Sequence, residues 1–525
     1  MLPSIESIFS DYENLRIQFN SLYSREETKD VLLKNYEQEI SRLNEIVRDL
    51  QRSKFGKKSE RWESSEQLVF NEAEAQSQKS DPTVDDEEFD DSIAVKAHVK
   101  KKRGHRRALP AELEREEITL ELPESERFTD DGTPLKVIGF EISEKLSYEP
   151  SKTKVIVYRR AKYGVDSGDY VKTAPPVASI IPKGIATAEL LASVVIEKYG
   201  YGMPLYRQEY KFDQMGVDLT RQTMARWVVK SSEACMPVWN VLCDRLLDSF
   251  YVSCDETQTQ VLKEAGRKVE SKSWMWVRCK PSGKNKIVLF DYDPHRSAEV
   301  AKKLLSEFKG FLQVDGFASY NALEKDVELT RIGCNMHGRR YFEKAITVGA
   351  KPGQTLAEVA MKFYKRLYDH EKEIRELPTD DRYRLRQEIQ VPIWTEFKTW
   401  ADTNKGKVPP KSKIGEAFNY FRSEYQHLIG YLKDGRLEMD NGFAERAIRK
   451  FAIGRNNWMF ADTEAGAHAS AMFYSLLCTA KVNDVNIFEA MKYLFNEIPK
   501  AKTIEDYELL ADIIMGIKSI PDKQG

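Results

Sequence analysis

The sequence has few cysteines, and their spacing is typical of neither a disulfide framework nor a Cys-ligated metal site. All six lie between Cys235 and Cys478 without a C-x-x-C pair, which suits free thiols in a reducing cytoplasm. The chain also lacks a signal peptide and any apolar run of about 18 residues, so we expect neither secretion nor a membrane span. Its formal net charge is only −2, and therefore only local charge clusters can indicate nucleic-acid binding.

A single hydrophobic core is not expected for a chain of 525 residues, because cores stop growing well below this length. Hydrophobic residues make up 41% and charged residues 31% of the sequence, as is usual for soluble proteins. We therefore expect a soluble protein with several domains, of the multidomain α+β class.

Four short runs rich in branched and aromatic residues predict β-strands in the middle of the chain. The first is residues 250–262, FYVSCDETQTQVL, and a helical run at residues 297–308 separates the third from the fourth. Three strands, a helix and a further strand form the order of an RNase H-like α/β domain. The other three runs are residues 274–279, 286–292 and 311–314.

Acidic residues accompany two of these predicted strands. Asp255 lies within the first run, and Asp315 directly follows the fourth. In an RNase H-like domain these two strands are neighbours at the centre of the sheet. We therefore expect the two carboxylates to lie close together.

A third carboxylate is needed from a helix, and Glu445 is the strongest candidate. Asn441, Glu445 and Arg449 follow one another at i, i+4 and i+8, so they share one helix face. Phe443 and Phe451 can face a core from the same helix. Taken alone, such a glutamate is more often a surface residue paired with the arginine.

Longer blocks of sequence carry a family resemblance. In chain order, DETQTQVL, QVDGFASYN, CNMHGRRYFEKA and DNGFAERAIRKFAIGRNNWMFADTEAGAHASAMFYSLLCTAKVND closely resemble blocks of the insertion-sequence-66 transposase family, from about residue 43 to residue 494. The resemblance implies a bacterial, nucleoid-associated DNA transposase of the DDE type that acts on terminal inverted repeats and target DNA. It also implies that Asp255, Asp315 and Glu445 are the catalytic triad. Because many relatives require accessory proteins, such proteins are candidate partners of this chain as well.

The three carboxylates suggest a metal-dependent mechanism. Oxygen ligands without His or Cys favour Mg²⁺ or Mn²⁺. We expect two ions about 4 Å apart, with Asp255 bridging both and Asp315 and Glu445 each completing one. The predicted reaction is cleavage at the ends of the insertion sequence followed by strand transfer. Two alternatives stay open: an RNase H-like nuclease or resolvase that cuts without joining, and a DNA-binding regulator with an inert catalytic domain.

Several basic residues are candidates for DNA contact. A predicted helix-turn-helix with a turn at Gly216 and an N-cap at Thr220 presents Arg and Gln, the side chains best suited to base edges, although many helical hairpins bind nothing. Near the carboxylates, arginines can bind phosphate in a bidentate way. The candidates are Arg221, Gln222 and Arg226 in the hairpin, His337, Arg339 and Arg340 after the fifth predicted strand, and Arg446, Arg449 and Arg455 beyond Glu445.

The N-terminal third combines a helical pattern with strong local charge. Apolar residues within residues 5–50 recur by three and four, which predicts either a self-associating coiled coil or a helix packed on its own domain. A basic stretch with aromatic residues follows, and an acidic linker then gives way to a basic arm. Either basic stretch could neutralise DNA phosphates or remain solvated. The candidate DNA-binding residues are Lys57, Lys58 and Arg61 in the first basic stretch and Lys101, Lys102 and Arg103 in the second.

A small β module is predicted next, from β runs within residues 118–171. Relatives usually carry cysteines of a zinc-binding module here, but this chain has no thiol before Cys235. A Cys-ligated zinc is therefore excluded from the module, and its role in DNA binding is uncertain. The expected domains are residues 1–62 (coiled coil with a basic end), 63–107 (disordered linker), 108–175 (β module), 176–245 (helix-turn-helix domain), 246–350 with 436–485 (catalytic domain), 351–435 (helical insertion) and 486–525 (closing helices).

Overall fold

The structure is a computed structural model, and it describes residues 10, 13–18, 36, 39–40, 42–43, 46–47, 153–164, 171–317, 320, 323, 329–346 and 355–521. Most of the predicted coiled coil lies outside these residues. The predicted linker of residues 63–107 and most of the β module lie outside them too. All helices and strands named below belong to the unit that contains Arg159–Gly525.

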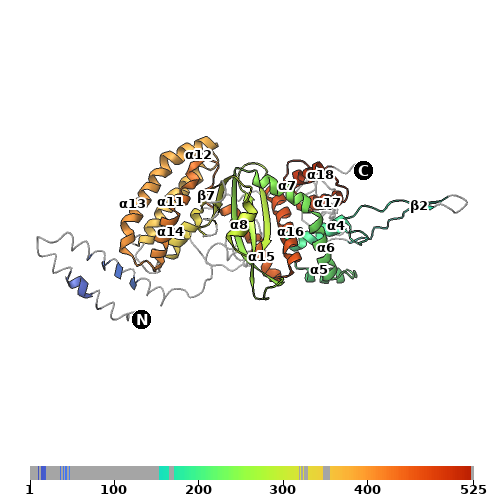
Figure 1. Ribbon diagram of the computed structural model, residues 1–525, viewed down its shortest axis with the longest axis horizontal. Helices are drawn as coiled ribbons and strands as arrows, with labels where there is room; N and C mark the ends of the chain where they lie inside the picture. Colours follow the sequence, from blue (N-terminus) through green and yellow to red (C-terminus); the bar gives the residue numbers. More distant parts are fainter. Residues whose placement is uncertain are drawn as a thin grey trace, which may run out of the picture. The chain divides into compact units, whose positions relative to one another are not determined.

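A six-stranded mixed sheet forms the centre of this unit (Figure 1). Its first three strands are antiparallel neighbours, whereas β3, β6 and β7 run parallel to one another. The main path has the order β5-β4-β3-β6-β7, and a short strand, β8, pairs with the far end of β3. The strands are β3 (Tyr251–Lys263), β4 (Lys272–Lys280), β5 (Ile287–Asp293), β6 (Gly310–Val314), β7 (Leu329–Gly333) and β8 (Ala461–Thr463).

The four predicted strands and the helix between them are confirmed. That helix is α8 (Ala298–Leu305), and it begins where the Ser297 side chain accepts a hydrogen bond from the Val300 amide, a common way to satisfy a free helix N–H. The predicted fifth strand is β7, which runs directly into α10 (Asn335–Lys344). Asp255, within β3, and Asp315, directly after β6, therefore belong to neighbouring strands, as expected.

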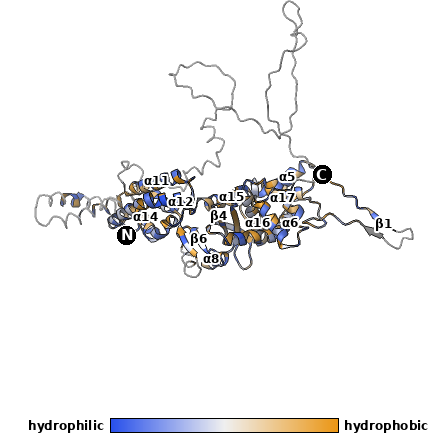
Figure 2. Ribbon diagram, turned by 90° about the horizontal axis from the view of Figure 1, so that it is seen from above, coloured by the Kyte–Doolittle hydropathy of each residue, from blue (hydrophilic) through white to orange (hydrophobic). Residues whose placement is uncertain are grey.

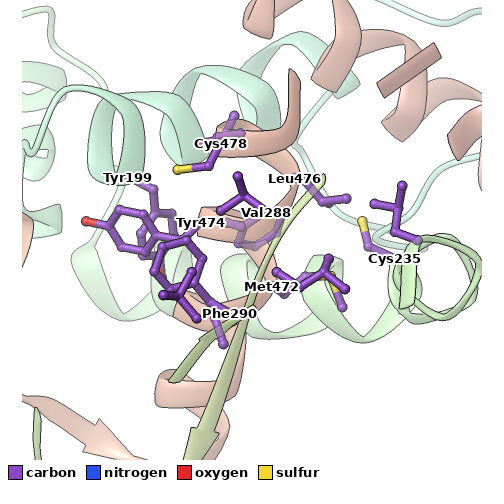
Figure 3. Packing of buried hydrophobic residues seen from close by; sticks show 14 of the residues in the cluster. Tyr199, Cys235, Val288, Phe290, Met472, Tyr474, Leu476 and Cys478 are labelled. Atoms are coloured by element: carbon purple, nitrogen blue, oxygen red, sulfur yellow. The ribbon is translucent and has the colours of Figure 1, made fainter. Parts of the chain in front are cut away.

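A long helix rich in small residues, α16 (Glu464–Val482), packs on the sheet and contributes to the main hydrophobic core. Tyr474 lies in contact with Phe290 of β5 and with Tyr199, at ring-centroid distances of 5.6 and 5.4 Å (Figure 3). The Ala and Ser residues of α16 allow this close approach.

The same helix also occupies the open edge of β5. Three polar side chains, spaced by four residues along α16 and just beyond its end, exchange hydrogen bonds with backbone N–H and C=O groups of the strand. An edge strand left open is a template for pairing with other chains, so this contact covers the β5 edge of the sheet. The pairs are Ser475 with Phe290, Thr479 with Val288 and Asn483 with Lys286.

The two helices and the turn predicted around Gly216 are present. Helix α5 (Leu205–Asp213) is followed by a turn in which Gly216 has a φ of 72°, and α6 (Arg221–Ala234) begins with the Thr220 side chain accepting from the Thr223 amide. Glycine tolerates positive φ without a Cβ clash. Further helices surround this hairpin: α4 (Ala188–Val195), η3 (Ile196–Gly200), α7 (Met236–Leu247), α17 (Ile487–Glu497) and α18 (Ile504–Ile514).

Only the end of the described β module is a hairpin. It consists of β1 (Lys162–Gly164) and β2 (Val171–Thr173). Residues 154–164 form the last of the β runs predicted within residues 118–171, but residues 154–161 are not in a strand. Val155 and Val157 are highly exposed, and high β propensity alone does not form a strand without a partner to pair with.

The predicted helical insertion forms a second core. Its aromatic residues pack together, for example Phe397 with Phe421 at a ring-centroid distance of 4.4 Å. Helices α11 and α14 carry both polar and apolar residues (Figure 2), as expected for helices with one buried face. None of the helices in the described part of the chain has the length and apolar character needed to cross a membrane. The helices are α11 (Leu356–Ile374), α12 (Thr379–Leu385), η4 (Arg386–Gln390), α13 (Val391–Asn404), η5 (Lys405–Lys407), α14 (Lys413–Leu428) and η6 (Gly430–Lys433).

Candidate active site

The register of the parallel pair β3 and β6 brings two of the predicted carboxylates together. Ser253 lies opposite Gln313, and continuing this register by two residues puts Asp255 opposite Asp315. The third predicted carboxylate, Glu445, lies in the first turn of α15 (Gly442–Trp458), which packs against β3 and β4.

Electrostatics support the proximity of the three carboxylates. Burial raises the pKa of Asp255 well above its usual range, and the negative charges of Glu256, Glu445 and Asp315 raise it further. A hydrogen bond of 2.9 Å from the Glu256 amide to Asp255 Oδ1 acts in the opposite direction. Because charges act on a pKa mainly at short range, Glu445 and Asp315 lie near Asp255.

Asp315 is held by contacts that sequence reasoning missed. The Phe317 amide donates to its Oδ1 at 3.0 Å, and Arg331 Nη2 donates to its backbone carbonyl at 3.1 Å. Arg331 is fully buried and forms an ion pair with Glu424 of α14. The helical insertion thus reaches the backbone of Asp315 through one arginine.

The start of the Glu445 helix is fixed by Asn441. Its Nδ2 donates to the Cys254 carbonyl at 2.7 Å, directly beside Asp255, and its backbone amide donates to Cys334 Sγ at 3.2 Å. Asn441 is 2% exposed, so these contacts are shielded from water. This residue therefore ties the Glu445 helix to β3 and to the end of β7. The sequence placed it only on the same helix face as Glu445.

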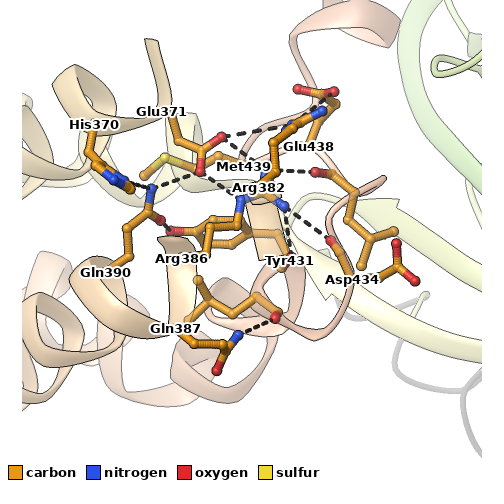
Figure 4. Close-up of polar contacts among 12 residues, drawn as sticks. His370, Glu371, Arg382, Arg386, Gln387, Gln390, Tyr431, Asp434, Glu438 and Met439 are labelled. Carbon is orange, nitrogen blue, oxygen red and sulfur yellow. Dashed lines mark hydrogen bonds and ion pairs between the residues drawn. The ribbon is translucent and has the colours of Figure 1, made fainter. Parts of the chain in front are cut away.

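A buried arginine network holds the chain segment that leads into α15 (Figure 4). Arg386 forms a bidentate ion pair with Glu371 at 2.8 and 2.9 Å, the strong geometry for an arginine and a carboxylate. Its remaining N–H groups donate to three backbone carbonyls of the segment, at 2.9–3.3 Å. These carbonyls belong to Tyr431, Asp434 and Leu437.

Of the three predicted phosphate contacts on α10, two lie against Glu445. His337 Nδ1 is 3.5 Å from Glu445 Oε1, and Arg340 Nη2 is 3.6 Å from Oε2. Arg339 lies elsewhere, with its guanidinium 6.0 Å from the ring of Tyr368. Burial lowers the pKa of His337, with Asp315 opposing and Arg340 adding to this effect. At neutral pH His337 is therefore mainly neutral.

A mixed group of potential metal ligands overlaps the site. Among the described residues, the ligand atoms of Cys334, His337 and Glu445 all lie within 4.8 Å of one another. The sequence analysis found no metal-site spacing among the cysteines and assigned the metal ions to the three carboxylates, so the C-x-x-H pair of Cys334 and His337 was missed. Burial, followed by the charge of Glu445, raises the pKa of the Cys334 thiol, which disfavours the thiolate that zinc binds.

The acidic neighbour of Asp255 has partners of its own. Glu256 accepts hydrogen bonds from Tyr320 OH and Arg296 Nε, both at 2.6 Å. Arg296 in turn lies 3.6 Å above the ring of Phe317, two residues after Asp315. Glu256 therefore links β3 to the segment that follows Asp315. The sequence shows only that Asp255 and Glu256 are neighbours, and it does not indicate these contacts of Glu256.

The other predicted DNA-binding residues are distributed over several surfaces. Arg221, Gln222 and Arg226 are exposed on α6. On α15, Arg446 is exposed, whereas Arg449 and Arg455 are partly buried. The six candidates in the N-terminal basic stretches lie outside the described residues: Lys57, Lys58, Arg61, Lys101, Lys102 and Arg103. All six cysteines are free, which confirms the prediction of free thiols.

Comparisons with known proteins agree with the resemblance seen in the sequence. A family model described as "Transposase IS66 family" matches residues 183–469, and a second, described as "Transposase C of IS166 homeodomain", matches residues 42–118. Uncharacterized protein y4qI of Sinorhizobium fredii is 32% identical over 91% of this chain and 89% of its own length. Uncharacterized protein y4hP of the same organism is 27% identical, over 78% and 77%. The chain therefore belongs to the IS66 family of transposases.

Proposed function

We propose that this chain is a metal-dependent DNA transposase with an RNase H-like catalytic domain, which cleaves DNA at insertion-sequence ends and joins the cleaved ends to target DNA. The observation that carries this proposal is the β3–β6 register, which continues to Asp255 opposite Asp315, with Glu445 in the first turn of the helix that packs on β3. The strand order and the delivery of the third carboxylate by a helix support the same reading.

The donor set fits divalent cations. Mutual repulsion among the carboxylates, which helps to raise the pKa of Asp255, is relieved by positive charge, and three oxygen donors suit Mg²⁺ or Mn²⁺. In this proposal Asp255, Asp315 and Glu445 would hold the ions through their carboxylate oxygens. When bound, such ions activate water or a DNA 3′-hydroxyl and stabilise the leaving oxygen of an in-line displacement.

The chain's own residues position the DNA. Arg340 and the mainly neutral His337 lie beside Glu445, so they can donate to a phosphate held at the carboxylates. Helix α6 presents Arg221, Gln222 and Arg226 for contact with the terminal repeats. We also propose self-association through the N-terminal helical segment, and accessory transposition proteins are further candidate partners.

The test uses the purified full chain with DNA that carries the terminal repeats flanking its own gene. After incubation with Mg²⁺ or Mn²⁺, every new 3′ end and junction is sequenced. We expect junctions to target DNA, and we expect Asp255→Asn and Glu445→Gln to lose all chemistry while keeping DNA affinity. Glu396→Gln, an exposed change on α13, is the control and should retain full activity.

Each other outcome points to an alternative. Cleaved ends that never join to target would indicate a nuclease or resolvase. DNA binding without metal dependence or cleavage would favour a regulator. Cleavage by Glu445→Gln at the wild-type rate would refute the assignment of the triad.

A further inference from the structure

The end of the Glu445 helix carries two exposed apolar side chains on a strained turn. Met459 has a φ of 66° and is 71% exposed, and the next residue, Phe460, is 42% exposed. The Phe460 amide donates to the Trp458 carbonyl at 2.8 Å, so Met459 is the central residue of a γ-turn with positive φ, a rare and strained conformation. Glycine would adopt it without strain.

The fold does not require methionine at this position. Its side chain is mostly in water, so it adds little to the core, and its backbone conformation is unfavourable for a residue with a Cβ. A residue that is unfavourable in both respects indicates a role outside the fold. The described structure contains other exposed methionines, such as Met236 at 44%, but Met236 lies in a helix rather than on a strained turn.

The turn is held rigidly on both sides. Before it, the Met459 amide donates to the Arg455 carbonyl at 2.6 Å. After it, β8 begins at Ala461 and pairs with Val261 of β3. The backbone that carries the two apolar side chains is therefore anchored to the sheet that contains Asp255. A ligand that presses against these side chains meets a fixed turn rather than a flexible loop.

The surroundings match nucleic acid rather than an apolar protein surface. Between Glu445 and the turn, α15 presents Arg449 and Asn456 on the face of Glu445, at spacings of four and seven. Beside the turn, Asn457 Nδ2 donates to the Gly202 carbonyl at 2.9 Å. This contact brings the end of α15 next to Tyr201, which is 72% exposed just before the helix-turn-helix.

We propose that Met459 and Phe460 form a wedge that enters a base step of the bound terminal-repeat DNA and unstacks it. Proteins that kink DNA use apolar side chains of this kind. The inference rests on the proposed function, because it needs DNA lying along α15. Met459 follows Glu445 by fourteen residues, so at about 1.5 Å per residue it lies about 21 Å further along the helix. At about 3.4 Å per base pair, the unstacked step is about six base pairs from the phosphate at Glu445.

The test places 2-aminopurine, whose fluorescence rises on unstacking, at each position of a terminal-repeat duplex bound by the full chain. We expect a rise of several-fold, confined to steps about five to seven base pairs from the cleavage position. Met459→Gly should lose at least four-fifths of this rise and bind the duplex about 3- to 10-fold more weakly. It should unfold at the same temperature as wild type or slightly higher, because glycine suits the turn. Phe460→Ala should give a partial loss.

Met236→Ala is the matched control, and it should leave both fluorescence and affinity unchanged. Full unstacking by the Met459→Gly variant would overturn the proposal, as would uniform quenching along a duplex that the wild type binds. A change in oligomeric mass of Met459→Gly with unaltered unstacking would assign the turn to a protein contact instead, and would also overturn it. Wild-type protein that binds no terminal-repeat DNA would refute the proposed function itself.

Discussion

The contact between α16 and the edge of β5 predicts a large effect from a small change, Thr479→Val. The Val288 amide donates to Thr479 Oγ1 at 3.0 Å, and the hydroxyl donates back to the Val288 carbonyl at 2.9 Å. Both residues are fully buried. Valine keeps the shape and the branching of threonine, so the substitution removes only the hydrogen bonds.

Its cost follows from the two backbone groups left without a partner. Each buried polar group left unsatisfied costs about 1–3 kcal/mol, and we expect a loss of about 3 kcal/mol for the pair. For a domain of about 150–250 residues, 1 kcal/mol corresponds to about 2–4 °C in Tm. The thermal midpoint of the sheet unit should therefore fall by about 6–12 °C.

Hydrogen exchange measured by mass spectrometry provides a local assay. Peptides covering β5 should exchange faster in Thr479→Val, whereas those covering the helical insertion should not change. Thr403→Val is the matched control, since the Thr403 hydroxyl donates to the Thr399 carbonyl on an exposed helix face, and it should shift stability by less than about 0.5 kcal/mol. Equal effects of the two substitutions would refute the assignment of an energetic role to the edge contact.

Three further predictions concern the site and its supports. Because the pKa of Asp255 is raised, the folded state binds the proton of this carboxyl group more tightly than the unfolded state does. Ionising Asp255 therefore costs folding stability, and the cost grows as the pH rises above the unfolded pKa of about 4. Asp255→Asn should raise the metal-free Tm more at pH 8 than at pH 5, and a lower Tm than wild type at pH 8 would contradict this. Arg386→Met should lower the unfolding free energy of the insertion by about 3–5 kcal/mol in urea titrations followed by circular dichroism, since it leaves a buried carboxylate unpaired, and a loss below about 1 kcal/mol would count against the network. Glu424→Gln should lower the cleavage rate about 10-fold with DNA affinity unchanged, because Arg331 then holds the Asp315 carbonyl less firmly; an unchanged rate would show that this link has no role.

Local sequence signals were sufficient for the elements that surround the site. Residue type and spacing predicted the strands and α8, because buried strands and amphipathic helices leave a periodic pattern. The turn at Gly216 and the cap at Thr220 did the same for the helix-turn-helix. The run at residues 154–161 shows the limit of this approach, because a strand also needs a partner that no local pattern specifies.

The supports of the site could not be predicted in the same way. Arg331 and Arg386 are fully buried, whereas arginine in a sequence ordinarily indicates a solvated position. Their burial depends on acids and carbonyls that are remote along the chain and become neighbours only in the folded state. Asn441 is a similar case, since its partners Cys254 on β3 and Cys334 at the start of α10 belong to different elements and no spacing rule connects them.

The contact that closes the edge of β5 also has a consequence for protein synthesis. Val288 and Thr479 are 191 residues apart in the sequence, and a ribosome adds about 5–20 residues per second, so the strand is made about 10–40 s before the helix that covers it. During this interval the nascent chain exposes unpaired N–H and C=O groups that can pair with other nascent chains on the same messenger. Premature termination before α16 would leave this exposure permanent, so truncated products are expected to aggregate rather than to persist as inactive but soluble proteins.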